Sequence, residues 1–309
     1  MRDINTVAVI GGGLIGMSWA SLFLARGVKV VVVDQRPEAE EQLHAFVEEA
    51  WPLLLALNLT TNKHVPKAYF TVSIADLSDV DFVQECGPDR IEIKRQLISE
   101  LEQVVADDVI IASSTSSLMA TDIQSNAHHP ERILVAHPMN PPHLVPMVEL
   151  VAGSATPEHT LVAAEVFYQR MQRVTIRVQK EVTGHLANRL TSALYREAVY
   201  CAAEGIASVA DIDKAITYGP GMRWAILGPH LTYHLGGGAG GYQHYLDHLG
   251  PTQEARWREH GTPVLTDEVK ALLVAGIEEE LQQQDRDSLS QRRDAALVEI
   301  FRLKQEFGF

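Results

Sequence analysis

The feature that most constrains this chain is a glycine-rich turn near its start. An apolar run at residues 7–10 precedes the turn, and a helical pattern at 14–26 follows it. The turn itself consists of Gly11, Gly12, Gly13, Leu14, Ile15 and Gly16. In a strand–turn–helix unit, glycines at the first, third and sixth positions allow a tight bend, a close approach of a pyrophosphate, and close helix–strand packing. The start of the helix offers free N–H groups to that pyrophosphate. These six residues are therefore predicted to bind a dinucleotide.

An acidic residue after the second strand indicates which dinucleotide. Residues 28–33 form another apolar run, and Asp34 follows it directly. This is where the dinucleotide fingerprint places an acid that accepts hydrogen bonds from the ribose hydroxyls. The negative charge would repel a 2′-phosphate, so NAD is favoured over NADP. Arg36 is a competing signal, because an arginine there could receive that phosphate.

Strand and helix patterns alternate in the first part of the chain. Further apolar runs lie at 82–84, 109–112, 133–136 and 174–178, with helical patterns at 38–57 and 92–105 between them. Such alternation predicts a parallel sheet covered by helices. From residue 182 onward only helical patterns occur, at 186–204, 209–216, 265–284 and 291–304, and the glycine-rich run 236–241 is expected to be a loop. We predict an α/β Rossmann-type domain over 1–181 and an all-α domain, for substrate binding and dimerisation, over 182–309.

Composition excludes several classes of protein. The 309 residues carry a formal net charge of −14, which argues against a nucleic-acid partner, because phosphate binding needs clustered Lys and Arg. The two cysteines, Cys86 and Cys201, have no spacing typical of a metal site or a disulfide framework, so no metal is expected. No apolar run is long enough for a membrane span, and the start lacks a signal-peptide pattern. A cytoplasmic protein is expected.

Polar residues that could carry out chemistry follow two of the predicted strands. A hydroxyl-rich run at 113–117 follows one strand, and His137 follows another. Ligands of doubly wound sheets bind at the carboxyl ends of the strands. Glu149 lies downstream in an apolar stretch. A histidine with a carboxylate on its second ring nitrogen is suited to act as a general base near neutral pH.

Several motifs taken together resemble one known family. They are the glycine turn, Ser114-Thr115-Ser116-Ser117-Leu118, His137 with Asn140-Pro141, Glu149, and Lys180-Glu181-Val182-Thr183-Gly184-His185-Leu186-Ala187-Asn188-Arg189-Leu190. In this order they are similar to the L-3-hydroxyacyl-CoA dehydrogenase superfamily, over nearly the whole chain. The resemblance implies an NAD-dependent oxidoreductase with a Rossmann-type domain, an all-helical domain and a homodimeric state.

The resemblance also implies roles for individual residues. His137 would be the catalytic base, oriented by Glu149. Ser116 and Asn188 would be catalytic residues that contact the substrate or the nicotinamide, and Asn140 would contact the substrate.

Two positions in this part of the comparison depart from the family. Asp89 and Lys94 fall where the family has cofactor-contacting residues, but the usual residue at the first position is Glu. His185 stands where members that act on hydroxyacyl-CoA usually have Phe. Asp89 and Lys94 are kept as cofactor-binding candidates.

Three substrate classes compete within the family. Members that bind 3-hydroxyacyl-CoA carry a long, lysine-bearing helical arm, whereas residues 38–70 here are short and contain only Lys63 and Lys67. The branch that oxidises L-gulonate, a sugar acid, shares the short arm. The segment 218–238 and Gly184-His185 are most similar to members that oxidise L-carnitine to 3-dehydrocarnitine. Carnitine is therefore the first expectation, a sugar acid the second, and 3-hydroxybutyryl-CoA the third.

The chemistry of carnitine fits the same segment. A trimethylammonium group has no N–H to donate and is usually held by aromatic faces. Tyr218, Trp224 and Tyr233 supply such faces, and Arg223 could pair with a carboxylate. The alternative is that these aromatic residues belong to the core of the helical domain.

A non-enzymatic alternative also exists, because a crystallin-like protein of this fold would be a structural NAD-binding protein. Such a protein would tolerate loss of the histidine–glutamate pair. The pair is present here together with Ser116 and Asn188, so we expect an enzyme.

Overall fold

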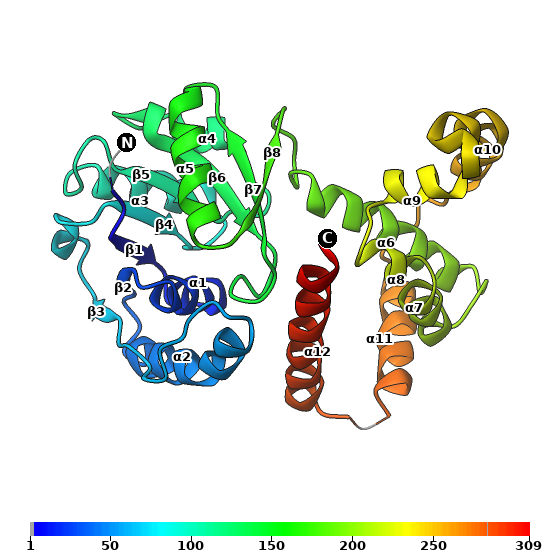
Figure 1. Ribbon diagram of the computed structural model, residues 1–309, viewed down its shortest axis with the longest axis horizontal. Coiled ribbons are helices and arrows are strands. Elements are labelled where there is room, and N and C mark those ends of the chain that lie inside the picture. Colours follow the sequence, from blue (N-terminus) through cyan, green and yellow to red (C-terminus); the bar gives the residue numbers. More distant parts are fainter. Residues whose placement is uncertain (1–2, 283) are drawn as a thin grey trace. The chain divides into compact units, whose positions relative to one another are not determined.

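A computed structural model describes residues 3–282 and 284–309 (Figure 1). Its internal contacts divide the chain into two units, Met1–Arg189 and Leu190–Phe309. The contacts of residues 182–189 group these residues with the first unit. The domain boundary expected after residue 181 stays a prediction. No helix in the described part of the chain is long and apolar enough to cross a membrane.

The first unit is built on one eight-stranded sheet with the order β3-β2-β1-β4-β5-β6-β7-β8. The strands are β1 (Thr6–Ile10), β2 (Lys29–Val33), β3 (Tyr69–Thr71), β4 (Phe82–Glu85), β5 (Ile110–Ser113), β6 (Ile133–Pro138), β7 (Met147–Ala152) and β8 (Val174–Val178). Strands β4 and β5 are buried along their whole length, as expected for strands covered on both faces. The α/β prediction is therefore confirmed.

The sequence predicted a sheet in which all strands are parallel, and the observed sheet differs from this at one strand pair. Strand β7 pairs antiparallel with β6, whereas all other neighbouring strands are parallel. The connection from Pro138 to Met147 is too short for a crossover helix, so the chain returns alongside β6 in the opposite direction. The antiparallel return places residues that are distant in sequence directly opposite each other.

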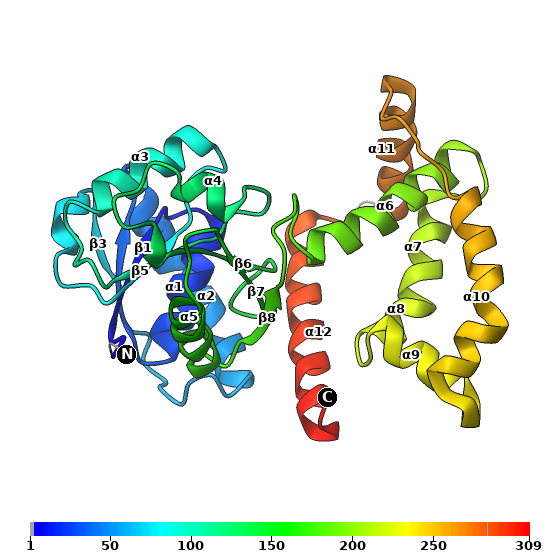
Figure 2. The same cartoon turned by 90° about the horizontal axis from the view of Figure 1, so that it is seen from above.

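Helices cover both faces of this sheet. Helices α3 (Ile91–Leu101) and α4 (Ala120–Gln124) lie on one face, and α1 (Leu14–Ala25), α2 (Ala39–Ala56) and α5 (Glu158–Arg170) lie on the other (Figure 2). Aromatic side chains join α1 to α5: the ring centroids of Trp19 and Tyr168 are 5.5 Å apart, as are those of Phe23 and Phe167. This packing holds the strands, and hence the loops at their carboxyl ends, on a rigid frame.

The second unit is helical. Its helices are α6 (Ala187–Ala203), which begins just before the unit boundary, α7 (Val209–Tyr218), α8 (Pro220–Trp224), α9 (Pro229–Gly236), α10 (Gly241–Glu259), α11 (Asp267–Leu281) and α12 (Arg286–Phe307). Side-chain caps define several starts: Ser208 accepts from the N–H of Asp211, and Thr266 from that of Val269. The all-α prediction for this part is confirmed.

The glycine-rich run 236–241 forms a tight connection. It ends α9, makes one 3₁₀ turn over Gly238–Gly240, and begins α10. A Cβ atom on Gly237 would lie 1.9 Å from the carbonyl oxygen of Gly241, so a larger residue does not fit there. Helix α10 itself was not predicted, because its apolar residues are too few to form a clear stripe.

Candidate active site

The glycine turn joins β1 to α1 and leaves space on its outer side. Gly11 has a φ of +99°, and a Cβ on it would meet the carbonyl oxygen of Cys86 at 2.8 Å. A Cβ on Gly16 would lie 1.8 Å from the carbonyl oxygen of Gly11, so glycine is needed for α1 to approach the strand. At Gly13, which caps α1, a Cβ would meet no atom within 4 Å. This open space at a helix N-terminus fits the pyrophosphate of NAD.

Asp34 lies against the same turn at the end of β2. Its Oδ2 accepts a hydrogen bond from the Gly12 N–H at 2.7 Å, and its Oδ1 accepts from Arg36 Nε at 3.1 Å. Arg36 also donates to the Gly12 carbonyl. Burial opposes ionisation of Asp34, but the hydrogen bonds from Arg36 and Gly12 outweigh it and lower the pKa of the carboxyl. Asp34 is therefore a carboxylate beside the glycine turn, in the position where it can accept hydrogen bonds from the hydroxyl groups of the adenosine ribose.

The carboxyl ends of the strands surround a cavity of about 370 Å³. Predicted site residues from separate segments line it: Ile15, Asp89, Lys94, Ser116, His137, Asn140 and Asn188. Because these segments all follow the carboxyl end of a strand or pack against it, the tertiary fold brings them to one place.

His137 and Glu149 face each other across the antiparallel pair of β6 and β7. His137 Nδ1 lies 2.8 Å from Glu149 Oε2. The other carboxylate oxygen accepts the backbone N–H groups of Leu186 and Ala187, each at 2.8 Å. Burial opposes ionisation of Glu149, but the bonds from His137 and these two N–H groups outweigh it and lower its pKa. Since an ionised carboxylate only accepts, Nδ1 carries the hydrogen, and Nε2 of a neutral His137 is left with a lone pair.

Asp89 organises the hydroxyl-rich loop after β5. It accepts hydrogen bonds from the hydroxyl groups of Thr115, Ser116 and Ser117. Burial opposes its ionisation, but these bonds and the charge of Lys94 outweigh it and lower its pKa. The Asp89 carboxylate thus gathers three hydroxyl groups at the edge of the cavity.

A buried ion pair lies beneath this loop. Lys94 Nζ is 2.8 and 3.0 Å from the two carboxylate oxygens of Glu85, and it donates to the Gly87 carbonyl at 3.2 Å. Ser113 donates to the same carboxylate. Sequence reasoning did not identify Glu85, although this residue ends β4 at the edge of the sheet where the site lies, and it included Ser113 only as part of the hydroxyl-rich run. The ammonium of Lys94 is fully engaged by the protein, so its contact with the cofactor stays a prediction.

The predicted substrate residues of the second unit lie on neighbouring helices. Tyr218 ends α7 and is 80% exposed, while Arg223 and Trp224 lie on α8. Tyr233, on α9, stacks on Tyr245 with ring centroids 4.5 Å apart, so one of its faces is covered. Their role in binding substrate stays a prediction.

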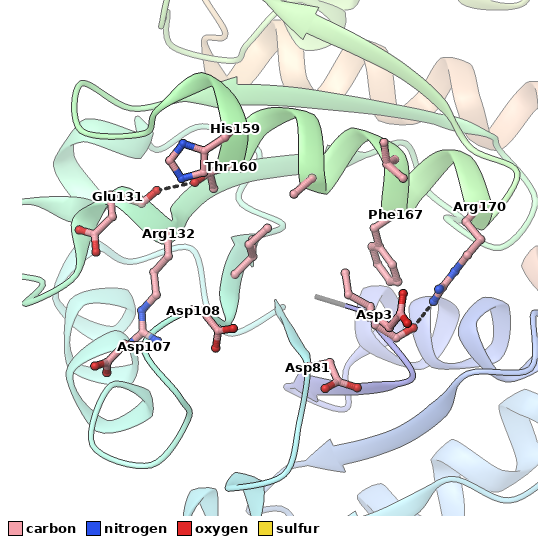
Figure 3. Close-up of a pocket in the computed structure, with 14 residues that line it drawn as sticks. Asp3, Asp81, Asp107, Asp108, Glu131, Arg132, His159, Thr160, Phe167 and Arg170 are labelled. Carbon is pink, nitrogen blue, oxygen red and sulfur yellow. Dashed lines mark hydrogen bonds between the residues drawn. The ribbon is translucent and has the colours of Figure 1, made fainter. Parts of the chain in front are cut away.

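A larger cavity, of about 640 Å³, lies at the other end of the sheet (Figure 3). Its lining includes Asp3, Asp81 and Asp108, which precede β1, β4 and β5. It is therefore at the amino ends of the strands, away from the glycine turn. The smaller cavity, with the histidine–glutamate pair, is the candidate active site.

A dinucleotide-binding turn combined with a histidine–carboxylate pair at the carboxyl edge of one sheet defines a class of protein, the NAD-dependent dehydrogenases. Within that class, the chain belongs to the 3-hydroxyacyl-CoA dehydrogenase family. Residues 6–182 match the NAD-binding domain of the family, and residues 184–283 match its C-terminal domain.

Individual relatives are similar over almost the whole chain. An L-carnitine dehydrogenase of Streptomyces coelicolor is 40% identical, covering 99% of this chain and 97% of the relative. An L-carnitine dehydrogenase of Oceanobacillus iheyensis is 39% identical over 98% of this chain and 99% of the relative. Among solved structures, the NAD⁺-dependent 5-formyl-3-hydroxy-2-methylpyridine 4-carboxylic acid 5-dehydrogenase has a TM-score of 0.85 and 25% identity, with 98% and 99% of the chains covered.

These matches confirm the predicted family, the two-part fold, NAD as cofactor, and oxidoreductase activity. They say nothing about the roles of single residues, the exact domain boundary, the oligomeric state or the cellular location, which stay predictions.

Proposed function

We propose that the protein oxidises the 3-hydroxyl group of L-carnitine to give 3-dehydrocarnitine and NADH. The observation that supports the reaction most directly is the His137–Glu149 pair beside the cavity that Ser116 and Asn188 also line. The choice of substrate is supported by the near full-length similarity to relatives named L-carnitine dehydrogenase.

In the proposed mechanism, His137 Nε2 accepts the hydroxyl proton of the substrate. NAD bound at the glycine turn supplies the acceptor for the hydride that leaves the same carbon. Glu149 holds the Nδ1–H and stabilises the imidazolium that forms, because its charge lies 2.8 Å away. Asn188 donates a hydrogen bond to the oxygen as it becomes a carbonyl, and Ser116 does the same once its hydroxyl, which donates to Asp89 in the structure, turns to the substrate.

The proposed cofactor site combines the turn Gly11–Gly16 with Asp34, Asp89 and Lys94. The turn receives the pyrophosphate, and Asp34 receives the ribose hydroxyls. Asp89 and Lys94 act at the nicotinamide end, where both line the cavity. The ionised Asp34 supports NAD over NADP.

For the substrate, we propose that aromatic faces receive the trimethylammonium group and that a cation receives the carboxylate. Tyr218 and Trp224 have exposed aromatic surface, and Tyr233 contributes its uncovered face. Arg223, on the same helix as Trp224, would pair with the carboxylate.

A 3-hydroxyacyl-CoA substrate has less support. Helix α2 begins with the acidic residues Glu40 and Glu41 in its first turn and has no basic residue in its last. Between the end of α2 and the start of β3, the only lysine or arginine residues are Lys63 and Lys67. The polyanionic nucleotide of CoA would meet repulsion here rather than an arm of lysines.

A single assay separates the three substrates. NADH formation is followed by absorbance with L-carnitine, L-gulonate or 3-hydroxybutyryl-CoA at matched concentrations. We expect the highest kcat/KM with L-carnitine. Rapid reduction of NAD with either of the other two, and none with L-carnitine, would refute the substrate assignment while leaving the dehydrogenase class intact.

We also propose a homodimer. In the described part of residues 190–309, the buried hydrophobic side chains are Val199, Ala202, Tyr245 and Val298. Large apolar side chains on α12 are exposed at Ile300, Leu303 and Phe307, whose spacing puts them on one helix face. A second copy of the chain is the partner that the family implies for such a face.

We also propose a cytoplasmic location. Cys86 and Cys201 are both free, as in proteins of a reducing compartment.

A further inference from the structure

His185 is a buried histidine that the proposed mechanism leaves without a role. It follows Gly184, and both residues have a positive φ, +50° at His185 and +78° at Gly184. Its side chain is 1% exposed. A residue other than glycine is uncommon in the left-handed region, and an imidazole is also polar, so a fully buried histidine held there calls for a specific explanation.

Hydrogen bonding defines the state of this ring. His185 Nε2 lies 3.1 Å from the carbonyl oxygen of Thr115, an atom that can only accept, so Nε2 carries a hydrogen. His185 Nδ1 is buried and has no hydrogen-bond partner among the described residues. A hydrogen on Nδ1 would be buried without an acceptor, so the ring is neutral.

The surroundings favour the same neutral state. The ring centroids of His185 and His137 are 5.3 Å apart. Burial, and secondarily the neighbouring His137, lower the pKa of His185, and the hydrogen bond to Thr115 with the charges of Glu149 and Asp89 only partly oppose this. A neutral His185 adds no repulsion when His137 takes up a proton.

The segment around His185 links the two halves of the site. The next two backbone N–H groups, of Leu186 and Ala187, bind Glu149 behind His137. Asn188 Nδ2 donates to the carbonyl of Ser116 at 3.2 Å. His185 and Asn188 thus hold two successive carbonyl groups of the hydroxyl-rich loop.

We propose that His185 is a positioning residue, whose Nε2–H fixes the Thr115 carbonyl and thereby aims Ser116 into the cavity that it shares with His137. Asp89 binds the hydroxyl groups of the loop, and His185 binds a backbone carbonyl of the same loop. Together the two contacts fix the conformation of the loop. The inference rests on the proposed role of Ser116 in alcohol oxidation.

The test compares three substitutions at this position. In His185→Gln the side-chain amide reaches about as far as Nε2 and keeps a donor for the Thr115 carbonyl. In His185→Phe the ring volume is kept and the donor is lost. In His185→Asn the residue tolerates a positive φ but its amide is too short. Steady-state kcat and KM are measured with the best substrate of the wild-type protein, together with NADH binding by fluorescence.

We expect kcat to fall about tenfold in His185→Phe and in His185→Asn, as the loss of one well-placed hydrogen bond implies. KM should change less, because Ser116 acts as the carbonyl forms. His185→Gln should stay within about threefold of the wild-type kcat, and NADH affinity should be unchanged in all three.

Wild-type kcat in folded His185→Phe, or equal losses in His185→Gln and His185→Asn, would overturn the proposal. If His185→Phe does not fold, the Gln and Asn variants decide. Because the wild-type substrate is established first, a wrong substrate assignment and a wrong role for His185 give different results.

Discussion

At the scale of single residues, the site depends on how each charge is stabilised. Glu149 remains ionised although fully buried, because His137 and two backbone N–H groups bind it. That charge fixes the tautomer of His137 and leaves Nε2 free to take a proton. The sequence predicted this pair of residues, but the backbone donors follow only from the fold.

Substituting His137 should separate chemistry from binding. In His137→Ala, kcat/KM is expected to fall about a hundred- to ten-thousand-fold, the usual contribution of a positioned base. NADH affinity should stay near the wild-type value, because the pyrophosphate and ribose sites lie on other segments. Steady-state kinetics and fluorescence titration measure the two effects. A variant that keeps most of its activity would exclude His137 as the base.

Asp34 should decide between the two nicotinamide cofactors. Its carboxylate accepts two hydrogen bonds from the Arg36 guanidinium, so Asp34→Ala removes both the repulsion of a 2′-phosphate and these two contacts. The guanidinium then keeps its bond to the Gly12 carbonyl and has donors left for the phosphate. We expect kcat/KM with NAD to fall about tenfold and the value with NADP to rise, measured with one substrate under identical conditions. Arg36→Ala in the Asp34→Ala background is the control, and it should remove the gain with NADP. An unchanged cofactor preference would contradict this role of Asp34.

At the scale of elements, the sequence predicted six of the eight strands and seven of the twelve α-helices in the described part of the chain, and it missed β3, β7, α4, α5, α8, α9 and α10. Strand β7 was not predicted as a strand, because its apolar residues show no alternation that distinguishes a buried strand from a buried helix. Its antiparallel pairing could not be read from the sequence either. Yet this pairing is what places Glu149 opposite His137.

Two glycines of the turn should have opposite effects when replaced by alanine. Gly16→Ala puts a Cβ 1.8 Å from a backbone carbonyl oxygen and should cost about 3 kcal/mol of stability, near the upper end for overpacking. Gly13→Ala meets no protein atom within 4 Å and should leave stability nearly unchanged, but its methyl group would project towards the pyrophosphate and weaken NAD binding.

Chemical denaturation and NADH titration of both variants test this contrast. The decisive variant is Gly13→Ala. If it binds NADH as tightly as the wild type, the pyrophosphate does not lie against Gly13, whatever the effect of Gly16→Ala.

At the scale of the whole molecule, the two units differ in how much apolar surface they bury. The sheet of the first unit is enclosed by helices on both faces, whereas many large apolar side chains on α6, α11 and α12 are exposed. Large exposed apolar faces are typical of association surfaces, and this is the basis of the proposed homodimer. The sequence predicted these helices but not which of their faces stay uncovered.

A charge on the exposed face of α12 should disrupt the proposed homodimer. In Leu303→Glu, light scattering after size exclusion should report the monomer mass at concentrations where the wild type has twice that mass. Arg302→Ala, on the same helix, is the control and should keep the wild-type mass. A wild-type protein that is already monomeric would contradict the proposal.

The sequence alone determined the class of this protein, because a cofactor-binding turn is a local structure whose glycines and acid must occur at set intervals along the chain. It also determined the family, through motifs in a fixed order. Only the tertiary structure decided how His137, Glu149, Ser116 and His185 meet, because these contacts join segments far apart in the chain. The orientation of each ring and the charge of each carboxyl depend on donors that only folding brings within reach.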